Sequence, residues 1–333
     1  MKVALVLTIK NEARLLKSNL LYHLSIGVEK AYIYLDGTTD DSANTVKDLN
    51  NVEVCDSVSS EKYSHKKYLE KFWSQAEQHH TARQCLNTYD ALQKCKAQDI
   101  DWLISLDADE LFVPDSTGKV SLASFFKDTE TKNVELVYFK TLEVISRQLH
   151  YDKVMYQETQ FKTKKNFKSK FDQIYFKIGN PYSNKASSQS YWLGHTMGKA
   201  AIKVASEIIP KNVHRYQTIS GGAANSIQAG LLLHYHLYDF ENFIKKYQNF
   251  KQHPEVYLSG NKINGLKRLW ITMVNDPNMS DAYLMAYYKT YLLFTDKKMK
   301  RLGKTRFGNV FKRKEPASVT IDYPQNVLET LRH

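Results

Sequence analysis

The first 110 residues alternate between short apolar runs and longer segments whose apolar positions recur at helical spacing. Val3–Ile9 is an apolar run typical of a parallel strand that is buried on both faces. Further strands are predicted over Ala31–Leu35, Val52–Cys55 and Trp102–Leu106. Helices are predicted over Asn11–Ile26, from the capping cluster Thr38–Ser42 to Leu49, and from Tyr68 to Ala97. This order predicts an α/β fold with an open, mostly parallel sheet and right-handed crossovers.

Beyond residue 120 the periodicity is weaker, and from Ser146 to about Ser190 the chain is rich in aromatic residues and lysine. Helices are predicted over Ser121–Asp128, Glu241–Phe250 and Asp281–Phe294, and strands over Val134–Val144 and Leu231–Leu237. We therefore expect one domain over residues 1–250, with halves at 1–115 and 116–250. A helical, basic C-terminal extension is expected over residues 251–333.

Ligands of open parallel sheets bind where the strands end at their carboxyl termini. The first such segment, Thr8–Glu12, contains no glycine, which a dinucleotide-binding turn or a phosphate-binding loop would require. A nucleotide bound here would therefore be held by side chains. Asp36, at the end of the second strand, could accept a hydrogen bond from a base or a ribose hydroxyl. Taken alone, Asp36-Gly37 is more typical of a simple turn.

The fourth strand is followed directly by Asp107-Ala108-Asp109-Glu110. On an extended chain, residues two apart point to the same side, so Asp107 and Asp109 should converge. Carboxylates this close favour a hard cation such as Mg²⁺ or Mn²⁺, which shares its ligands with substrate phosphates. Such a cation would neutralise the charge that develops on a leaving diphosphate. The cluster is also typical of an acidic loop cap, but its place at a strand end favours a metal site.

Two histidines, His234 and His236, lie in the apolar run Leu231–Leu237. The period of a strand places both on one face, with Tyr235 on the other. Imidazole is a common ligand of ions of the Mn²⁺ class, so both are candidate metal ligands. The alternative interpretation is that the two histidines only form hydrogen bonds on a half-buried strand and bind no metal.

The net charge of +12 is unevenly distributed. Residues 1–150 carry 18 lysines and arginines against 22 acidic residues, whereas residues 151–333 carry 29 against 13. The second half therefore suits an anionic partner, such as phosphate, an anionic membrane surface or nucleic acid. Phe161–Lys170 interleaves phenylalanine with lysine, a pattern of single-stranded nucleic-acid binding and also of a solvated loop. Nine lysines or arginines between Lys297 and Lys314 could attract anionic lipid.

The apolar runs, the N-terminal segment and the cysteines together favour a cytoplasmic protein. No apolar run approaches the roughly 20 residues that span a bilayer. The segment Met1–Lys10 lacks the features of a signal peptide, and it is predicted to be a strand instead. The three cysteines, Cys55, Cys85 and Cys95, follow no metal-ligand spacing and are expected to be free thiols. We expect a cytoplasmic protein with peripheral contact at the inner face of the membrane.

Five motifs in the order of the chain resemble family 2-type glycosyltransferases. The most similar subgroup has a KNE opening, a DxDEF metal motif and an HY motif, and is akin to family 92. The motifs are Thr8–Ala13, Tyr34–Asp40, Asp107–Phe112, Gly198–Lys203 and His234–Lys246. Lys203 stands where the family has arginine, and His236 replaces an aromatic residue.

The resemblance implies a GT-A fold and transfer of a sugar from a nucleotide-sugar donor, UDP-hexose by default, with inversion. The acceptor would be a glycan or a lipid-linked sugar, residues 1–115 would bind the nucleotide and residues 116–250 the acceptor. Asp107 and Asp109 would engage the ribose and the metal–diphosphate, and His234 would be a metal ligand. The remaining donor-site candidates implied by the motifs are Thr8, Lys10, Asn11, Glu12, Asp36, Lys199, Lys203 and His214.

An inverting transfer needs a carboxylate that takes the proton of the acceptor hydroxyl. Glu143, Glu158, Asp172 and Glu207 lie in plausible segments, and we choose Glu158 because it falls in the variable region expected to meet the acceptor. A nucleotidyltransferase would share the sheet and the paired carboxylates, but it would have a glycine-rich, basic first loop. A nucleic-acid-binding protein using the basic, aromatic half would show a recognition helix or an RNA-binding signature, and the sequence has neither.

Overall fold

The computed structural model describes residues 1–116, 120–163, 183–184, 189–190, 197–252, 256–260, 262–263, 265–303 and 318–332. Residues 164–170 of the phenylalanine- and lysine-rich segment, Asp172 and residues 304–314 of the basic tail lie outside this description. The chain forms two compact units. Unit 1 comprises Met1–Thr141, Met197–His234 and Asp322–His333, and unit 2 comprises Leu142–Thr196 and Tyr235–Ile321.

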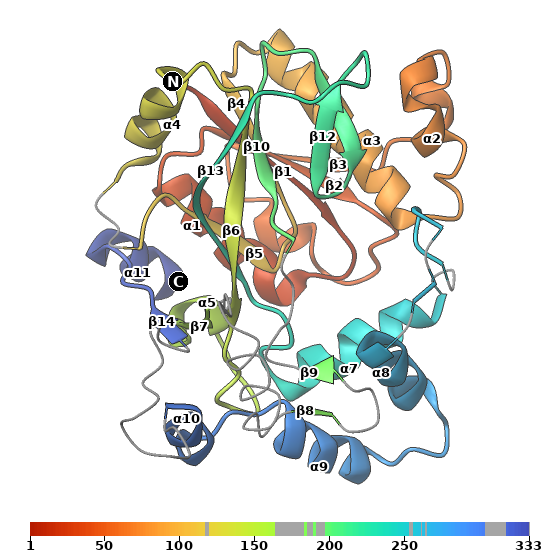
Figure 1. Cartoon of the computed structure of the whole chain (residues 1–333), viewed down its shortest axis with the longest axis vertical. Helices are drawn as coiled ribbons and strands as arrows, with labels where there is room; N and C mark the ends of the chain where they lie inside the picture. The colour runs from red at the N-terminus through yellow and green to blue at the C-terminus, as the bar shows by residue number, and fades with distance from the viewer. Residues whose placement is uncertain are drawn as a thin grey trace, which may run out of the picture. The chain divides into compact units, whose positions relative to one another are not determined.

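Unit 1 is built around a mixed sheet whose strands follow the order β3-β2-β1-β4-β10-β6 (Figure 1). The first four strands are parallel, and β10 lies antiparallel between β4 and β6. β13 pairs with β5. The elements are β1 Val3–Ile9, α1 Ala13–Ser25, β2 Lys30–Leu35, η1 Asn44–Val46, β3 Val52–Asp56, η2 Glu61–Tyr63, η3 Lys67–Leu69, α2 Glu70–Trp73, α3 His80–Ala97, β4 Trp102–Leu106, β5 Glu110–Val113, α4 Leu122–Glu130, β6 Leu136–Val144, β10 Ala200–Lys203, β11 Ile208–Asn212, β12 Arg215–Thr218, β13 Ser226–His234 and α11 Gln325–Arg332.

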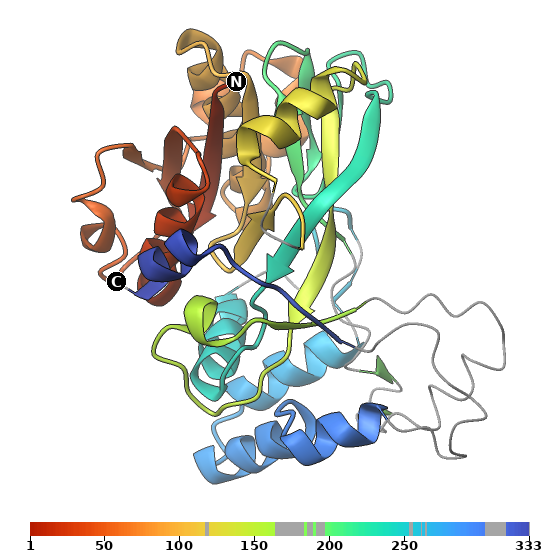
Figure 2. The same cartoon turned by 90° about the vertical axis from the view of Figure 1, so that its left-hand side faces the viewer.

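The core of unit 1 explains why the sequence pattern predicted its strands. Leu5 and Ile104, from β1 and β4, lie in one apolar cluster with Leu16 and Leu20 of α1. All four side chains are fully buried. At the other end of the chain, α11 packs against α1 (Figure 2). The rings of Tyr22 and Tyr323 meet edge to face at 5.7 Å. The predicted α/β fold, with a large sheet flanked by helices, is confirmed.

The helix predicted from Thr38–Ser42 to Leu49 is wrong, because this segment forms only the short turn η1. Its capping side chains are used elsewhere. The Ser42 hydroxyl accepts from the backbone N–H of Glu12 at 2.9 Å, and the Asp40 carboxylate accepts from the N–H of Ala13 at 3.1 Å. The cluster therefore caps the start of α1 instead of starting a helix of its own.

Two other predicted boundaries are corrected. The long helix predicted from Tyr68 to Ala97 is broken between α2 and α3, where the Arg83 guanidinium binds the carbonyl of Ala76. The predicted strand Leu231–Leu237 ends at His234 and begins earlier, at Ser226. Leu237 has a φ of 54°, a left-handed conformation that cannot continue a strand.

Unit 2 contains a second apolar core, formed by α7, α8 and α9. The end of β6 pairs with β7, and β7 pairs with β14. The elements are α5 Val154–Gln157, β7 Gln160–Lys162, β8 Ser183–Asn184, β9 Gln189–Ser190, α7 Phe240–Asn249, η5 Phe250–Gln252, α8 Gly265–Asn275, α9 Asp281–Tyr291, α10 Asp296–Gly303 and β14 Ser318–Thr320. Within the described ranges, no helix has the length and apolar character needed to cross a bilayer.

Candidate metal and nucleotide site

The acidic cluster after β4 forms a tight turn. The backbone N–H of Glu110 donates to the carbonyl of Asp107 at 3.0 Å, and the Glu110 carboxylate accepts from the N–H of Asp107 at 2.8 Å. The expectation of an extended chain over these residues is therefore wrong. Because the backbone turns between them, Asp107 and Asp109 contact different partners.

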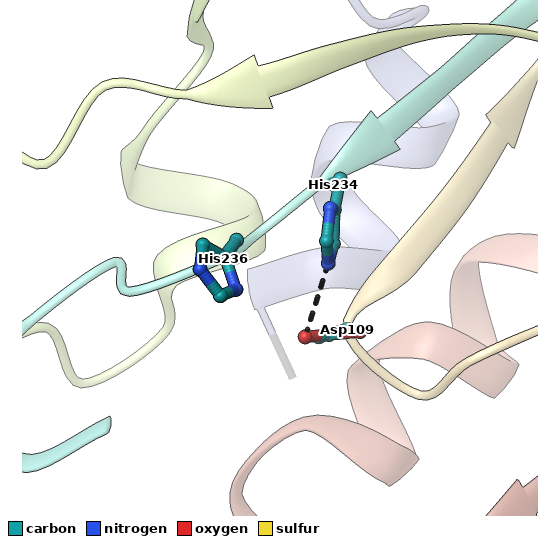
Figure 3. Close-up of side chains that lie close together, drawn as sticks. All are labelled: Asp109, His234 and His236. Carbon is teal, nitrogen blue, oxygen red and sulfur yellow. Dashed lines mark ion pairs between the residues drawn. The ribbon is translucent and has the colours of Figure 1, made fainter. Parts of the chain in front are cut away.

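Asp109 lies beside the end of β13 (Figure 3). His234 is opposite Glu110 in the antiparallel pair of β13 with β5, so its ring reaches the turn that carries Asp109. The His234 Nε2 atom is 3.4 Å from Asp109 Oδ2. One ligand atom of each of Asp109, His234 and His236 lies within 4.8 Å of the other two. Both histidines are buried, and only 13% of the Asp109 side chain is exposed.

This set of donors fits a divalent transition ion. Imidazole nitrogens and carboxylate oxygens bind such ions at about 2.0–2.2 Å, which places ligand atoms of one ion roughly 3 to 4.5 Å apart. The spacing of Asp109, His234 and His236 is compatible with that requirement. Asp107, the fourth candidate ligand predicted from the sequence, is not a member of this group.

Asp107 is instead held by a buried cation and an amide. Its Oδ1 atom accepts from the Lys199 ammonium at 2.8 Å and from Gln84 Nε2 at 2.6 Å. Lys199 is fully buried and lies 4.0 Å from Glu110, whereas 39% of the Asp107 side chain is exposed. Burial raises the pKa of Asp107, but the Lys199 ammonium brings it below its ordinary value. Burial also raises the pKa of Glu110 to about 7, although Lys199 opposes this rise.

Gly198 explains how Lys199 reaches this position. A Cβ atom at residue 198 would lie 2.1 Å from the backbone carbonyl oxygen of Phe139 on the neighbouring β6. Only glycine permits this close approach of the two backbones. The motif Gly198-Lys199 therefore brings a charged group to the carboxyl end of β4, since β10 runs antiparallel to that strand.

The loops after β1 and β2 are joined to each other and to α3. Asn11, in a left-handed conformation with a φ of 58°, accepts from the N–H of Thr39 at 2.7 Å. The Asp36 carboxylate pairs with both Arg83 Nε and Arg83 Nη2, at 2.5 and 3.0 Å. Thr8 accepts from the side-chain amide of the buried Asn87 at 3.0 Å. Lys10 and Glu12 lie on the same loop as Asn11.

Two predicted site residues lie in other surroundings. Lys203 is opposite Trp102, at the beginning of β4, and pairs with Glu130 at 3.8 Å. Glu158 belongs to unit 2 and is fully buried. It accepts from Arg147 Nε at 2.8 Å and from the Tyr151 hydroxyl at 2.9 Å, so donors of its own unit already hold its carboxylate.

Three buried side chains of α1 bind the backbone of the segment Ala108–Phe112. Asn19 donates to the carbonyls of Ala108 and Glu110, at 3.0 and 2.7 Å. The Tyr22 hydroxyl donates to the carbonyl of Phe112 at 2.9 Å, and His23 Nε2 accepts from the N–H of the same residue at 3.2 Å. Because Nε2 is an acceptor, the proton of the neutral ring lies on Nδ1, which contacts the carbonyl and side-chain oxygens of Asn19.

His23 should make the stability of the chain depend on pH. Burial lowers its pKa to about 4, whereas an unfolded histidine has a pKa of about 6.5. Between these values the unfolded chain binds more protons, so stability falls as the pH decreases from 6.5 towards 4. The loss from this residue is roughly 2 kcal/mol between pH 7 and pH 5. In urea unfolding, His23→Gln should lose that much less stability over this interval than the unsubstituted chain, and equal pH slopes would contradict the assignment.

Sequence reasoning missed the residues that hold Asp36, Asp107 and the backbone around Asp109. Asn19 carried a usable signal, because it is a polar residue beside the apolar positions of a predicted helix, and a buried polar group must have partners. Arg83 and Gln84 carried none, because neighbouring polar residues on a helix are typical of a solvated face. Their partners became visible only once α3 was placed against the strand ends.

A family model and two curated relatives describe this chain as similar to glycosyltransferases. The model of glycosyltransferase family 92 matches residues 10–266. Two curated relatives from Arabidopsis thaliana, both described as glycosyltransferase-like, are 25% and 22% identical over 209 and 297 residues. These matches cover 59% and 84% of this chain but 45% and 55% of the relatives, so the chain spans about half the length of the curated relatives it matches.

Solved structures that match this chain do so with low TM-scores. Glucosyl-3-phosphoglycerate synthase from Mycobacterium tuberculosis is 11% identical with a TM-score of 0.30, and the match covers 76% of this chain and 81% of that chain. A 4-diphosphocytidyl-2C-methyl-D-erythritol synthase from Anaerococcus prevotii is 9% identical with a TM-score of 0.28, covering 61% and 70%.

Proposed function

We propose that this chain, which belongs to glycosyltransferase family 92, transfers a sugar from a nucleotide-sugar donor to a glycan or lipid-linked acceptor, using a divalent cation. The observation that carries the proposal is the group formed by Asp109, His234 and His236 at the carboxyl end of β4. This is the edge of a parallel sheet at which ligands of α/β proteins bind.

The ligand set favours an ion of the Mn²⁺ class over Mg²⁺. Two imidazoles and one carboxylate suit first-row transition ions, whereas Mg²⁺ prefers carboxylate, carbonyl and water oxygens. When bound, the ion would neutralise the negative charge of the leaving diphosphate. Asp109, His234 and His236 would hold it, and phosphate oxygens of the donor would complete its set of ligands. We infer that Mn²⁺ supports activity better than Mg²⁺.

The donor is proposed to lie along the ends of β1, β2 and β4, with UDP-hexose as the default donor. Lys199 would add a second fixed positive charge for the diphosphate, because it is buried and stays protonated. Asp107, whose side chain is partly exposed, would accept from the ribose. Asp36 would contact the nucleoside as a pair with Arg83, since both of its oxygens already accept from the guanidinium. The loop Thr8–Glu12 would line the same edge.

The catalytic base is assigned from the requirements of the reaction and not from a contact with an acceptor. Inverting transfer requires a carboxylate base, and Glu158 stays our prediction for it. Its full burial requires that the Arg147 and Tyr151 contacts open before the carboxylate meets an acceptor. The excess of lysine and arginine after residue 150 supports peripheral contact with an anionic membrane surface, where a lipid-linked acceptor would be available. None of the described contacts favours nucleotidyl transfer or nucleic-acid binding over this function.

A thermal-shift experiment tests the proposal directly. We expect UDP-hexoses to raise the unfolding temperature of the full chain when Mn²⁺ is present and to have little effect in excess chelator. The reason is that a ligand stabilises the folded chain more the more tightly it binds, and the diphosphate should bind chiefly through the cation. Equal shifts with and without metal would contradict the metal assignment. The absence of a shift with every nucleotide sugar would contradict the donor assignment.

A further inference from the structure

One buried side chain binds the backbone on both sides of Asp109. The Nδ2 atom of Asn19 lies 3.0 Å from the carbonyl oxygen of Ala108 and 2.7 Å from that of Glu110. These two residues flank Asp109 in the turn between β4 and β5. Asn19 has no exposed surface, so water cannot replace these hydrogen bonds without a rearrangement.

Asn19 is itself held in a fixed orientation. Leu16 and Leu20, on the same helix, are fully buried in the main apolar cluster of unit 1, which anchors α1. The His23 ring donates from Nδ1 towards Asn19 Oδ1 at 2.9 Å, which turns the Asn19 NH₂ group towards the turn. The Asn19 amide is therefore fixed in place, and it holds the backbone on both sides of Asp109.

We propose that Asn19 is a positioning residue for the metal site. It acts through the carbonyls of Ala108 and Glu110 to keep the Asp109 carboxylate close enough to His234 for both to bind the same ion. The inference rests on the proposed function, because it takes Asp109 as a metal ligand. Groups that orient a ligand without touching the ion typically change metal affinity 10- to 100-fold when they are removed.

If Asn19 only stabilised the fold, its replacement would affect stability but not the affinity for the metal. Tyr22, also on α1, provides a matched control for this distinction. Tyr22 lies one turn from Asn19 and also donates to the same segment, but its partner is the carbonyl of Phe112, three residues after Asp109. Loss of either donor leaves a buried carbonyl without its partner and should lower stability. Only loss of the Asn19 amide frees the backbone at Asp109 itself.

The experiment is a titration of the metal-free full chain with Mn²⁺, followed by electron paramagnetic resonance, with the unfolding temperature measured in parallel. Asn19→Leu should weaken Mn²⁺ binding roughly 10- to 100-fold. Asn19→Ser, which is smaller than asparagine and so avoids overpacking at this fully buried position, serves if the leucine variant does not fold and should weaken binding in the same direction. Tyr22→Phe should lower the unfolding temperature but leave the Mn²⁺ affinity within about twofold, because its bond lies beyond the ligand.

Two results would overturn this inference without affecting the proposed metal site. The first is an Mn²⁺ affinity of the Asn19 variants equal to that of the unsubstituted chain. The second is an equal loss of affinity in Tyr22→Phe, which would show a general loosening of the segment. Failure of the unsubstituted chain to bind Mn²⁺ would be a different outcome, since it would overturn the proposed metal site and this inference together.

Discussion

Replacing Asp109 with asparagine is expected to abolish the Mn²⁺-dependent hydrolysis of the nucleotide-sugar donor. The substitution keeps the size of the side chain but removes the only carboxylate in the group with His234 and His236. A bound cation contributes several kcal/mol of charge stabilisation in the transition state, and about 4 kcal/mol corresponds to roughly 1000-fold in rate. The measurement is the release of UDP from UDP-hexose by the full chain, with and without Mn²⁺.

The control for this variant is Asp128→Asn, which changes an exposed aspartate on α4 and should leave the rate unchanged. Metal binding, measured separately, should be weakened by Asp109→Asn and unaffected by Asp128→Asn. Full activity of the Asp109 variant would contradict its role as a ligand. Full activity of the unsubstituted chain in excess chelator would contradict the use of a metal altogether.

The sequence predicts the scaffold of unit 1 well because the scaffold depends on local patterns. Apolar runs such as Val3–Ile9 are buried on both faces of a parallel sheet, so they stand out from every other segment. The position of the acidic turn after β4 follows from the same pattern, since parallel strands end at a common edge. The pattern therefore placed the acidic turn at the edge of the sheet, although it did not describe which side chains hold that turn.

The contacts within the site depend on distant parts of the chain and could not be read from spacing. Asp107 and Asp109 look equivalent in sequence, but the turn directs Asp107 to Lys199 and Asp109 to His234. The predicted helix after Asp36 failed for a similar reason, because Asp40 and Ser42 cap α1 and not their own segment. In each case a polar side chain had two possible partners, and the tertiary arrangement selected one.

Replacing Lys199 with methionine is expected to lower stability and donor affinity together. The ammonium is fully buried between Asp107 and Glu110, so its loss leaves two carboxylates close together without their cation. Breaking a buried ion pair costs about 3 kcal/mol in the free energy of unfolding, at the lower end of the usual range because Asp107 is partly exposed. If Lys199 also contacts the diphosphate, loss of a charged hydrogen bond should weaken UDP binding roughly 10- to 100-fold.

Lys162 separates these two effects, because it forms a second buried ion pair of the same kind. Its ammonium lies 2.6 Å from Glu143, and both side chains are almost fully buried. Lys162→Met should therefore lower the free energy of urea unfolding by at least as much, since both partners are buried, yet leave the affinity for UDP in the presence of Mn²⁺ within about twofold. Calorimetric titration of both variants decides the question. If Lys199→Met binds UDP as tightly as Lys162→Met, the buried lysine only balances the charge of Asp107, and the diphosphate is held by the cation alone.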